Sequence, residues 1–161
     1  MTPATPTLTP VFDLTVRVAP PLEAGPVSGR GVQGLRRVIP ITGGTVSGGL
    51  NGEVLAGGAD FQLVVSDTTA DLDARYLLRL HDAGWAGAHV MVHNRALRRA
   101  SAADTARLVR GEPVDPGAVY FRCAPTFEVS HPALAWMTEH LFLGSGIRRP
   151  DHVAIRVFRV D

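Results

Sequence analysis

The sequence predicts an antiparallel β-barrel of the up-and-down or meander type, with about eight or more short strands and two short helices. Three observations favour this all-β class. Apolar and polar residues alternate in many short segments, glycine-rich turns separate the segments, and no strand–helix–strand rhythm appears. A parallel sheet would need that rhythm. A β-sandwich built from the same strands is the alternative architecture.

The chain of 161 residues fits one β-barrel domain spanning residues 1–161, in which the Pro/Thr-rich residues 1–9 form a loose lead-in. Alternation of apolar and polar residues is typical of half-buried strands. The three prolines and four glycines of residues 20–34 instead predict a long loop. We expect strands at 11–18, 35–41, 46–50, 52–55, 59–66, 71–80, 88–93, 119–124, 127–129 and 152–160.

Two short helices are expected among these strands. In residues 101–110, Ser101 is the expected N-cap, Asp104 stands three residues on, and Gly111 supplies the C-terminal stop. Residues 131–142 carry apolar side chains at helical spacing, with a proline near the first turn, where proline is allowed. Trp136 on this second helix is expected to pack in the core or to close one end of the barrel as a plug.

The charged residues exclude several kinds of chemistry. A net charge of +1 creates no field that would attract nucleic acid or an anionic membrane, so neither is an expected partner. All sixteen basic residues are arginines. Without lysine the chain can form no Schiff base and has no P-loop lysine and no lysine general base.

Cys123 is the only cysteine, which excludes an intrachain disulfide and a thiolate metal cluster. A buried structural cysteine is a better interpretation than a nucleophile, because no catalytic signature surrounds it. The first residues lack the basic and apolar regions of a signal peptide. No apolar run approaches the ~18 residues of a membrane span. The expected location is the cytoplasm.

Residues 39–62 carry seven glycines among β-forming residues and end at Asp60 and Gln62. So much glycine predicts repeated sharp turns with backbones in close approach. Alternation places Asp60 and Gln62 on one face of their strand. We interpret the segment as a glycine corner that aims an acid and an amide at a pocket. The structural alternative is an Asx-type cap, in which Asp60 only holds the glycine turn.

Alternation also groups other polar side chains. It places Asp73 and Arg75 on one face of their strand, and Tyr120 and Arg122 on one face of another. A barrel of about eight strands can hold one small ligand among apolar walls with a few polar groups. These four residues are therefore candidates for the pocket lining. For Asp73 and Arg75, an exposed cross-strand pair is an equally good interpretation.

Arg36 and Arg37 begin a strand, and alternation turns only one of them inward, so Arg37 is a candidate ligand-binding residue and a solvated edge is the alternative. His89 and His93 lie about 13 Å apart along a strand, too far for one ion, so no metal is expected. His93 is a candidate base at the barrel rim, or a solvated loop residue. The glycines match no dinucleotide or P-loop motif, so no cofactor is expected.

The chain contains, in order and over nearly its whole length, the blocks RRVIPITGGTVSG at 36–48, GGADFQ at 57–62, LDARY at 72–76, YFR at 120–122, FE at 127–128 and, after Trp136, LFLG at 141–144. Together these blocks resemble the domain-of-unknown-function family numbered 3237. The resemblance implies a single-domain, lipocalin-like or calycin-like β-barrel and no settled activity. Family motif positions then fall on Asp60, Gln62, Asp73, Arg75, Tyr120, Arg122 and Glu128.

This chain departs from the family pattern at three places. The family usually has Trp where Phe61 stands, often has Arg where Leu63 stands, and tends to read TPRFET where residues 124–129 read APTFEV. Two basic or polar lining groups are therefore missing. The departures imply a more apolar pocket, suited to a hydrophobic, polycyclic or polyketide-like molecule.

The leading functional hypothesis is a cofactor-independent enzyme that isomerises, cyclises, eliminates from or adds to a small hydrophobic metabolite inside the barrel. Asp60 would be the general base, Arg75 and Arg122 would stabilise an enolate or carboxylate, and Tyr120 would donate a hydrogen bond. The alternatives are a non-catalytic carrier barrel and a structural module that forms homo-oligomers. The candidate substrate-binding residues are Arg37, Phe61, Gln62, Asp73, Tyr76, His93, Glu128 and Trp136.

Overall fold

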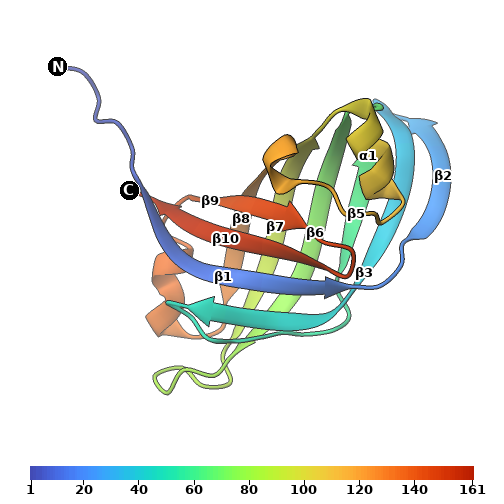
Figure 1. The fold of residues 1–161 in the computed structure, drawn as a ribbon. Helices are drawn as coiled ribbons and strands as arrows, with labels where there is room; N and C mark the ends of the chain where they lie inside the picture. The colour runs from blue at the N-terminus through green and yellow to red at the C-terminus, as the bar shows by residue number, and fades with distance from the viewer.

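Ten antiparallel strands form one sheet that closes on itself in the computed structural model, which describes residues 1–161 (Figure 1). The order is β1-β10-β9-β8-β7-β6-β4-β3-β2, with β5 paired between β3 and β6 beside β4, and pairing of β1 with β3 closes the ring. The predicted antiparallel barrel is confirmed. The strands are β1 (Leu8–Val18), β2 (Leu22–Gly29), β3 (Val32–Gly48), β4 (Gly52–Val54), β5 (Ala59–Val64), β6 (Thr69–Leu80), β7 (His89–Arg99), β8 (Tyr120–Val129), β9 (Phe142–Arg148) and β10 (His152–Val160).

The long strand β3 organises the closure. Its first half pairs with β2 and β5, and its second half pairs with β1 and β4. Gly44 has a φ of 148°, and a Cβ at this position would overlap the carbonyl oxygen of Thr15 in β1. Only glycine therefore lets β1 approach β3 this closely. The glycine-rich stretch thus brings backbones together, as its glycine content predicts.

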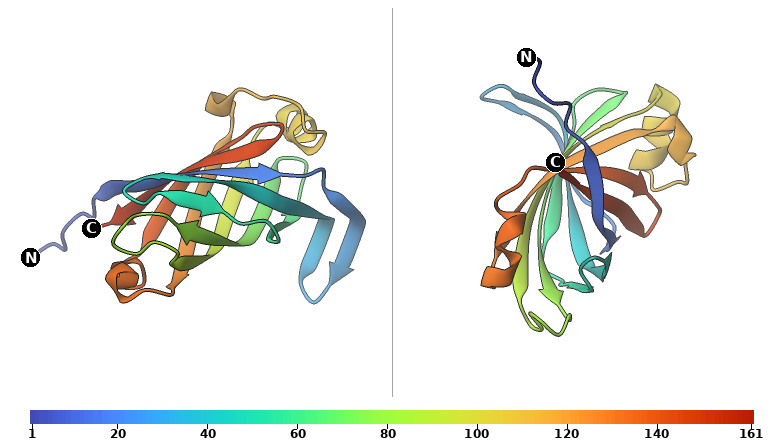
Figure 2. Two further views of the ribbon diagram at one scale, coloured as in Figure 1. Left: turned by 90° about the horizontal axis from the view of Figure 1, so that it is seen from below. Right: turned by 90° about the vertical axis from the view of Figure 1, so that its left-hand side faces the viewer.

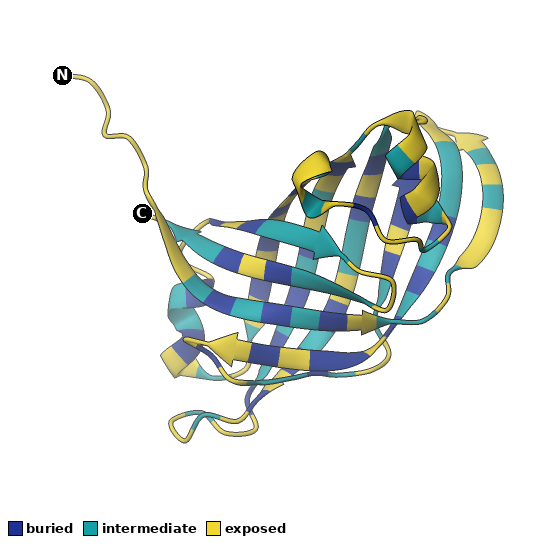
Figure 3. Ribbon diagram, viewed as in Figure 1, coloured by how far each residue is buried: buried dark blue, intermediate teal, exposed yellow.

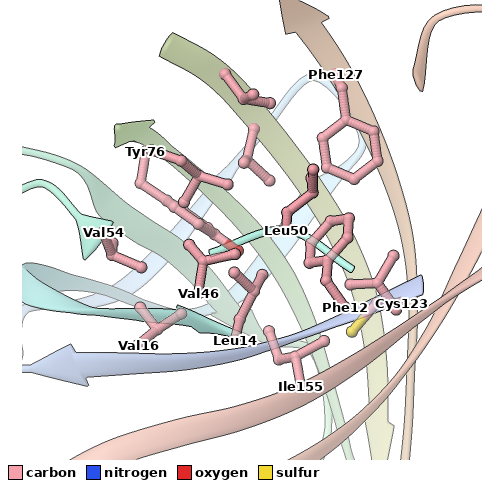
Figure 4. Packing of buried hydrophobic residues seen from close by; sticks show 14 of the residues in the cluster. Phe12, Leu14, Val16, Val46, Leu50, Val54, Tyr76, Cys123, Phe127 and Ile155 are labelled. Carbon is pink, nitrogen blue, oxygen red and sulfur yellow. The ribbon is translucent and has the colours of Figure 1, made fainter. Parts of the chain in front are cut away.

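One half of the barrel interior is filled by the hydrophobic core. Buried and exposed residues alternate along most strands (Figure 3), and Figure 4 shows the inward side chains packing together. The ring of Phe127 meets those of Phe12 and Phe142 edge-on, with centroids 5.9 and 5.1 Å apart. The buried Leu134 and Met137 belong to the 3-10 helix η2 (Pro132–Met137), which covers this end of the barrel.

The helix α1 (Ala102–Val109) lies at the opposite end of the barrel from η2 (Figure 2). Its N-cap is Ser101, which accepts a hydrogen bond from the backbone N–H of Asp104, as expected. A further 3-10 turn, η1, spans Pro116–Ala118. None of the helices has both the length and the apolar character that a membrane span requires.

The second predicted helix, at 131–142, is wrong in extent and type. Only η2 forms, and residue 142 already begins β9. Cβ atoms at Gly144 and Gly146 would crowd the side chains of Cys123 and Phe121 in β8. These glycines are therefore where β9 passes close to β8, and they do not end a helix.

Two other predicted boundaries are also wrong. Residues 20–34 are not a long loop, because they form β2 and the start of β3, joined by a tight turn in which Arg30 has a φ of 48° between two glycines. The strand predicted at 88–93 continues to Arg99 as β7. This extension is decisive for the site, because it carries Asn94 and Arg98 into the barrel.

Candidate functional site

Beside the core lies a narrow inner cavity of about 40 Å³. Its walls are mostly apolar, with Ile39, Ile41 and Ile155 among them. It adjoins a wider vestibule of about 370 Å³, which is lined by the end of α1, the loop after β1 and the loop after β9. The residues that line both spaces are Val18, Ile39, Gln62, Arg98 and Arg148.

Asp60 presents its carboxyl group to the inner cavity from β5 and is only 8% exposed. Pairing between β5 and β6 is interrupted between the pairs Asp60–Ala74 and Leu63–Asp71. In this gap the backbone N–H of Asp73 donates to Oδ1 of Asp60 at 2.9 Å. The carboxylate therefore binds the neighbouring strand, and no hydrogen bond ties it to the glycine turn, as an Asx-type cap would require.

A chain of buried polar groups holds the second carboxylate oxygen. Nη1 of Arg37 donates to Oε1 of Gln62 at 3.1 Å, which turns the amide nitrogen of Gln62 toward Oδ2 of Asp60 at 3.5 Å. Arg37 also donates to Glu23 at 2.9 Å and to the carbonyl of Val109, at the end of α1, at 2.8 Å. Arg37 is thus the inward member of the arginine pair, and its neighbourhood is not a solvated edge.

Burial makes Asp60 an acid that titrates near neutral pH. Loss of hydration raises the pKa of its carboxyl from 3.8 to about 6, against the opposing effects of the Asp73 N–H, the Arg98 charge and Gln62. A carboxyl group with this pKa can both accept and release a proton at physiological pH. Strongly perturbed carboxyl groups in cavities are typical of functional sites.

Arg98 is a buried cation of the inner cavity with spare donors, and it is not among the residues predicted from the sequence. It is 3% exposed, and its single side-chain hydrogen bond reaches Oε1 of Gln62 at 3.5 Å. Burial lowers the pKa of its guanidinium to about 10, so it stays charged near neutral pH. A buried guanidinium without a carboxylate partner can stabilise negative charge on a bound molecule.

Tyr76 and Asn94 contribute unsatisfied polar atoms to the same cavity. The hydroxyl of Tyr76 and Oδ1 of Asn94 are buried and have no hydrogen-bond partner. The Asn94 amide lies close enough to oppose the pKa rise that burial imposes on Tyr76, but it forms no hydrogen bond of good geometry with the hydroxyl. Unsatisfied polar atoms are rare in protein interiors, and a ligand would satisfy both.

The three other predicted catalytic residues lie outside the barrel, which corrects their expected place in the pocket. The side chain of Arg75 is 55% exposed and faces Asp73 at 3.5 Å. Tyr120 is 51% exposed, and the guanidinium of Arg122 lies 5.2 Å from its ring centroid on the same outer face. The inner faces of β6 and β8 carry apolar side chains and Tyr76 instead.

Most of the other predicted ligand-binding residues are also remote from the cavity. Asp73 forms an outer-face pair with His93, whose Nε2 lies 2.7 Å from its carboxylate. Phe61 and Glu128 are exposed, and Trp136 packs against Phe142 at the filled end, 5.9 Å between centroids. Of the predicted residues, the structure brings Asp60, Gln62, Tyr76 and Arg37 together.

We expect Cys123 to be chemically inert in the folded protein. It is buried, and loss of hydration raises the pKa of its thiol to about 11, so almost no thiolate exists at neutral pH. Ellman's reagent should therefore label Cys123 only as fast as the protein unfolds, and at once in denaturant. Rapid labelling under native conditions would contradict this structural role.

No three His, Cys, Asp or Glu side chains gather in a way that could hold a metal ion.

Solved structures share this barrel. Over 100% of both chains, the structure of a conserved protein of unknown function from Rhodopseudomonas palustris has 41% identity and a TM-score of 0.88. A beta-barrel like protein from Acinetobacter baumannii has 35% identity and a TM-score of 0.82 over 99% of each chain. An enzyme from Penicillium herquei, at 18% identity and a TM-score of 0.67 over 100% and 98% of the two chains, is similar in fold alone.

Sequence comparison leads to the same group. A UPF0311 protein of Rhodopseudomonas palustris is 42% identical over 151 residues, which cover 93% of this chain and 94% of the relative. A UPF0311 protein of Clostridium acetobutylicum is 38% identical over 152 residues, 94% of this chain and 92% of the relative. The family model described as "Protein of unknown function (DUF3237)" matches residues 6–160, and the chain belongs to that family.

Proposed function

We propose that the protein is a cofactor-independent enzyme that transfers a proton on a small, largely apolar molecule bound in the barrel. The reaction is an isomerisation, a cyclisation, or an elimination or addition. One observation carries the proposal: a carboxyl group with a pKa of about 6 lines an apolar cavity beside a cation and two unsatisfied polar atoms. This combination is typical of acid–base sites.

Asp60 is the proposed acid and base. It removes a proton from a carbon or oxygen of the substrate and returns it elsewhere on the molecule, which is efficient because its pKa lies near the operating pH. Gln62 and the Asp73 N–H hold the carboxylate in place. Arg98 stabilises the negative charge that develops on a substrate oxygen. Tyr76 and Asn94 orient the substrate, and together with Arg98 they take the roles that the sequence pattern suggests for Arg75, Arg122 and Tyr120.

A carrier that only binds its ligand accounts less well for Asp60. Apolar walls alone would hold a hydrophobic molecule, whereas a buried carboxyl group with a raised pKa destabilises the fold at neutral pH. Proteins keep such groups where they act. A purely structural module is also disfavoured, because the interior keeps a cavity lined by a carboxyl group, a guanidinium and two unsatisfied polar atoms.

The test uses 5-nitrobenzisoxazole, a small aromatic molecule that reports on any well-placed base. Abstraction of its C3 proton breaks the N–O bond and gives a coloured phenolate. We expect the wild type to catalyse this elimination at least about 10²-fold faster than Asp60→Asn. The rate should rise with pH through a midpoint near 6, as Asp60 ionises.

Asp13→Asn is the matched control, because Asp13 lies on the outer surface, paired with Arg156 at 2.8 Å. It should leave the rate unchanged, and the absence of lysine removes the usual background base. Equal rates for the wild type and Asp60→Asn would refute the assignment of Asp60. Binding of 5-nitrobenzisoxazole without turnover in any variant would favour the carrier.

A further inference from the structure

Two arginines stand at the border between the inner cavity and the vestibule without a carboxylate partner. Arg98 and Arg148 line both spaces, and neither forms a salt bridge. The other two arginines of the vestibule, Arg37 and Arg110, are paired with glutamates at 2.9 and 2.6 Å. The border therefore differs from the rest of the vestibule in having cations that form no salt bridge.

The hydrogen bonds of these two side chains leave most of their donors free. Arg98 has only the 3.5 Å bond to Gln62. Arg148 uses Nη1 alone, which donates to the carbonyl oxygens of Arg149 and, at 3.2 Å, His152. A guanidinium offers five N–H donors in a planar fork that matches a carboxylate. A buried or half-buried guanidinium with free donors is thus prepared for an anionic partner.

Neither of the carboxylates near the border forms a salt bridge with Arg98 or Arg148. Asp60 is the carboxylate of the inner cavity, and Asp151 of the vestibule is exposed and bonded to His152 at 2.8 Å. Burial lowers the pKa of Arg98, the charge of Asp60 opposes this effect, and repulsion by Arg148 and Arg37 adds to it. An anion at the border would relieve the repulsion, because it would lie close to at least two of the cations.

We propose that the ligand carries an anionic oxygen, as a carboxylate or a phenolate, which binds between Arg98 and Arg148 while its apolar body extends from the vestibule toward the inner cavity. The proposal rests on the proposed function and names its substrate class. It also orients the ligand, because the arginines lie at the vestibule side and the walls beyond them, such as Ile41 and Ile155, are apolar. The end of the apolar body then reaches the cavity that Asp60 lines.

The test compares 2-naphthoate with 2-naphthamide, which has nearly the same shape but no charge, by isothermal titration calorimetry. We expect the wild type to bind the carboxylate at least about tenfold more tightly than the amide. In Arg98→Gln and in Arg148→Gln this preference should fall by at least about tenfold or vanish. Arg75→Gln, on the outer face, should keep it. Equal binding of both compounds by the wild type would overturn the proposal, as would a preference that survives both site substitutions.

A second arm separates the two anions. If 4-nitrophenol binds as its phenolate, its absorbance shifts to that of the ionised form in the wild type and not in Arg98→Gln. The Asp60→Asn variant separates this inference from the proposed function. It should keep or strengthen the preference for naphthoate while losing turnover of 5-nitrobenzisoxazole. An anion preference in a protein without turnover refutes only the enzyme, and turnover without an anion preference refutes only this inference.

Discussion

Replacing Asp60 by Asn is expected to stabilise the protein at neutral pH by about 2 kcal/mol while removing its proposed activity. The difference between a pKa of 3.8 in the unfolded chain and about 6 in the fold corresponds to about 3 kcal/mol of destabilisation by the ionised carboxylate. Asn removes that charge and can still accept the Asp73 N–H. The NH2 group of the new side chain then faces the NH2 group of Gln62, and the loss of this hydrogen bond costs about 1 kcal/mol.

The stabilisation should depend on pH in a defined direction. Because the folded state raises the pKa of Asp60, the folded protein binds this proton more tightly than the unfolded chain does. The destabilisation is full above a pH of about 6, shrinks as the pH falls, and is gone below about pH 4. The advantage of Asp60→Asn over the wild type should therefore be largest at neutral pH and disappear in acid.

Urea unfolding of both proteins near neutral pH and near pH 4 measures this difference. Asp13→Asn is the control with the opposite sign, because the hydrogen bond to Arg156 lowers the pKa of Asp13, and removing the carboxylate should slightly destabilise the fold. If Asp60→Asn is less stable than the wild type at neutral pH, the interactions of the ionised carboxylate outweigh the cost of burying it. The pKa of Asp60 would then not be raised as proposed.

Alternation along a strand predicts which residues share a face. It does not predict whether the face with polar residues points into the barrel or out of it. On β6 it correctly groups Leu72 and Tyr76 against Asp73 and Arg75. The polar pair on this strand lies on the outer face. On β5 the polar face is the inner one, because Arg37 and the Asp73 N–H satisfy its groups. These partners are distant in sequence, so a local pattern does not contain them.

The strand limits explain the residues that sequence reasoning missed. Ala88, Val90 and Val92 alternate inward, and the same period continues through Asn94 and Arg98. A signal for both residues is therefore present. Residues 94–99 are nevertheless mostly polar, which suggests that the strand has ended. A buried arginine is not expected on a strand unless the cavity that it lines is already known. The strand β9, which ends at Arg148, is not predicted from the sequence, because its glycines are residues that usually interrupt a strand.

Gly44→Ala is expected to destabilise the protein by more than about 4 kcal/mol and to open the barrel between β1 and β3. A Cβ there would overlap the Thr15 carbonyl oxygen and lie 3.2 Å from Cα of Val16. The φ of 148° adds strain for any residue with a Cβ. All of these neighbouring atoms are backbone, so no side-chain rotation can relieve the overlap, and β1 itself must move.

Substitutions at two other glycines distinguish the two causes of this loss of stability, which are the overlap of the added Cβ and the strain of the backbone. Gly57 has a φ of 111° and open space where a methyl group would lie, so Gly57→Ala should cost only the strain of its backbone, about 1–2 kcal/mol. Gly84 has open space and no such φ, and Gly84→Ala should change stability by less than about 0.5 kcal/mol. Urea unfolding of the three variants ranks their stabilities, and a Gly44→Ala protein as stable as Gly57→Ala would refute the role of close approach.

Because Val16 and Val18 of β1 line the cavity, separating β1 from β3 should also abolish binding of 2-naphthoate, which ties ligand binding to closure of the barrel.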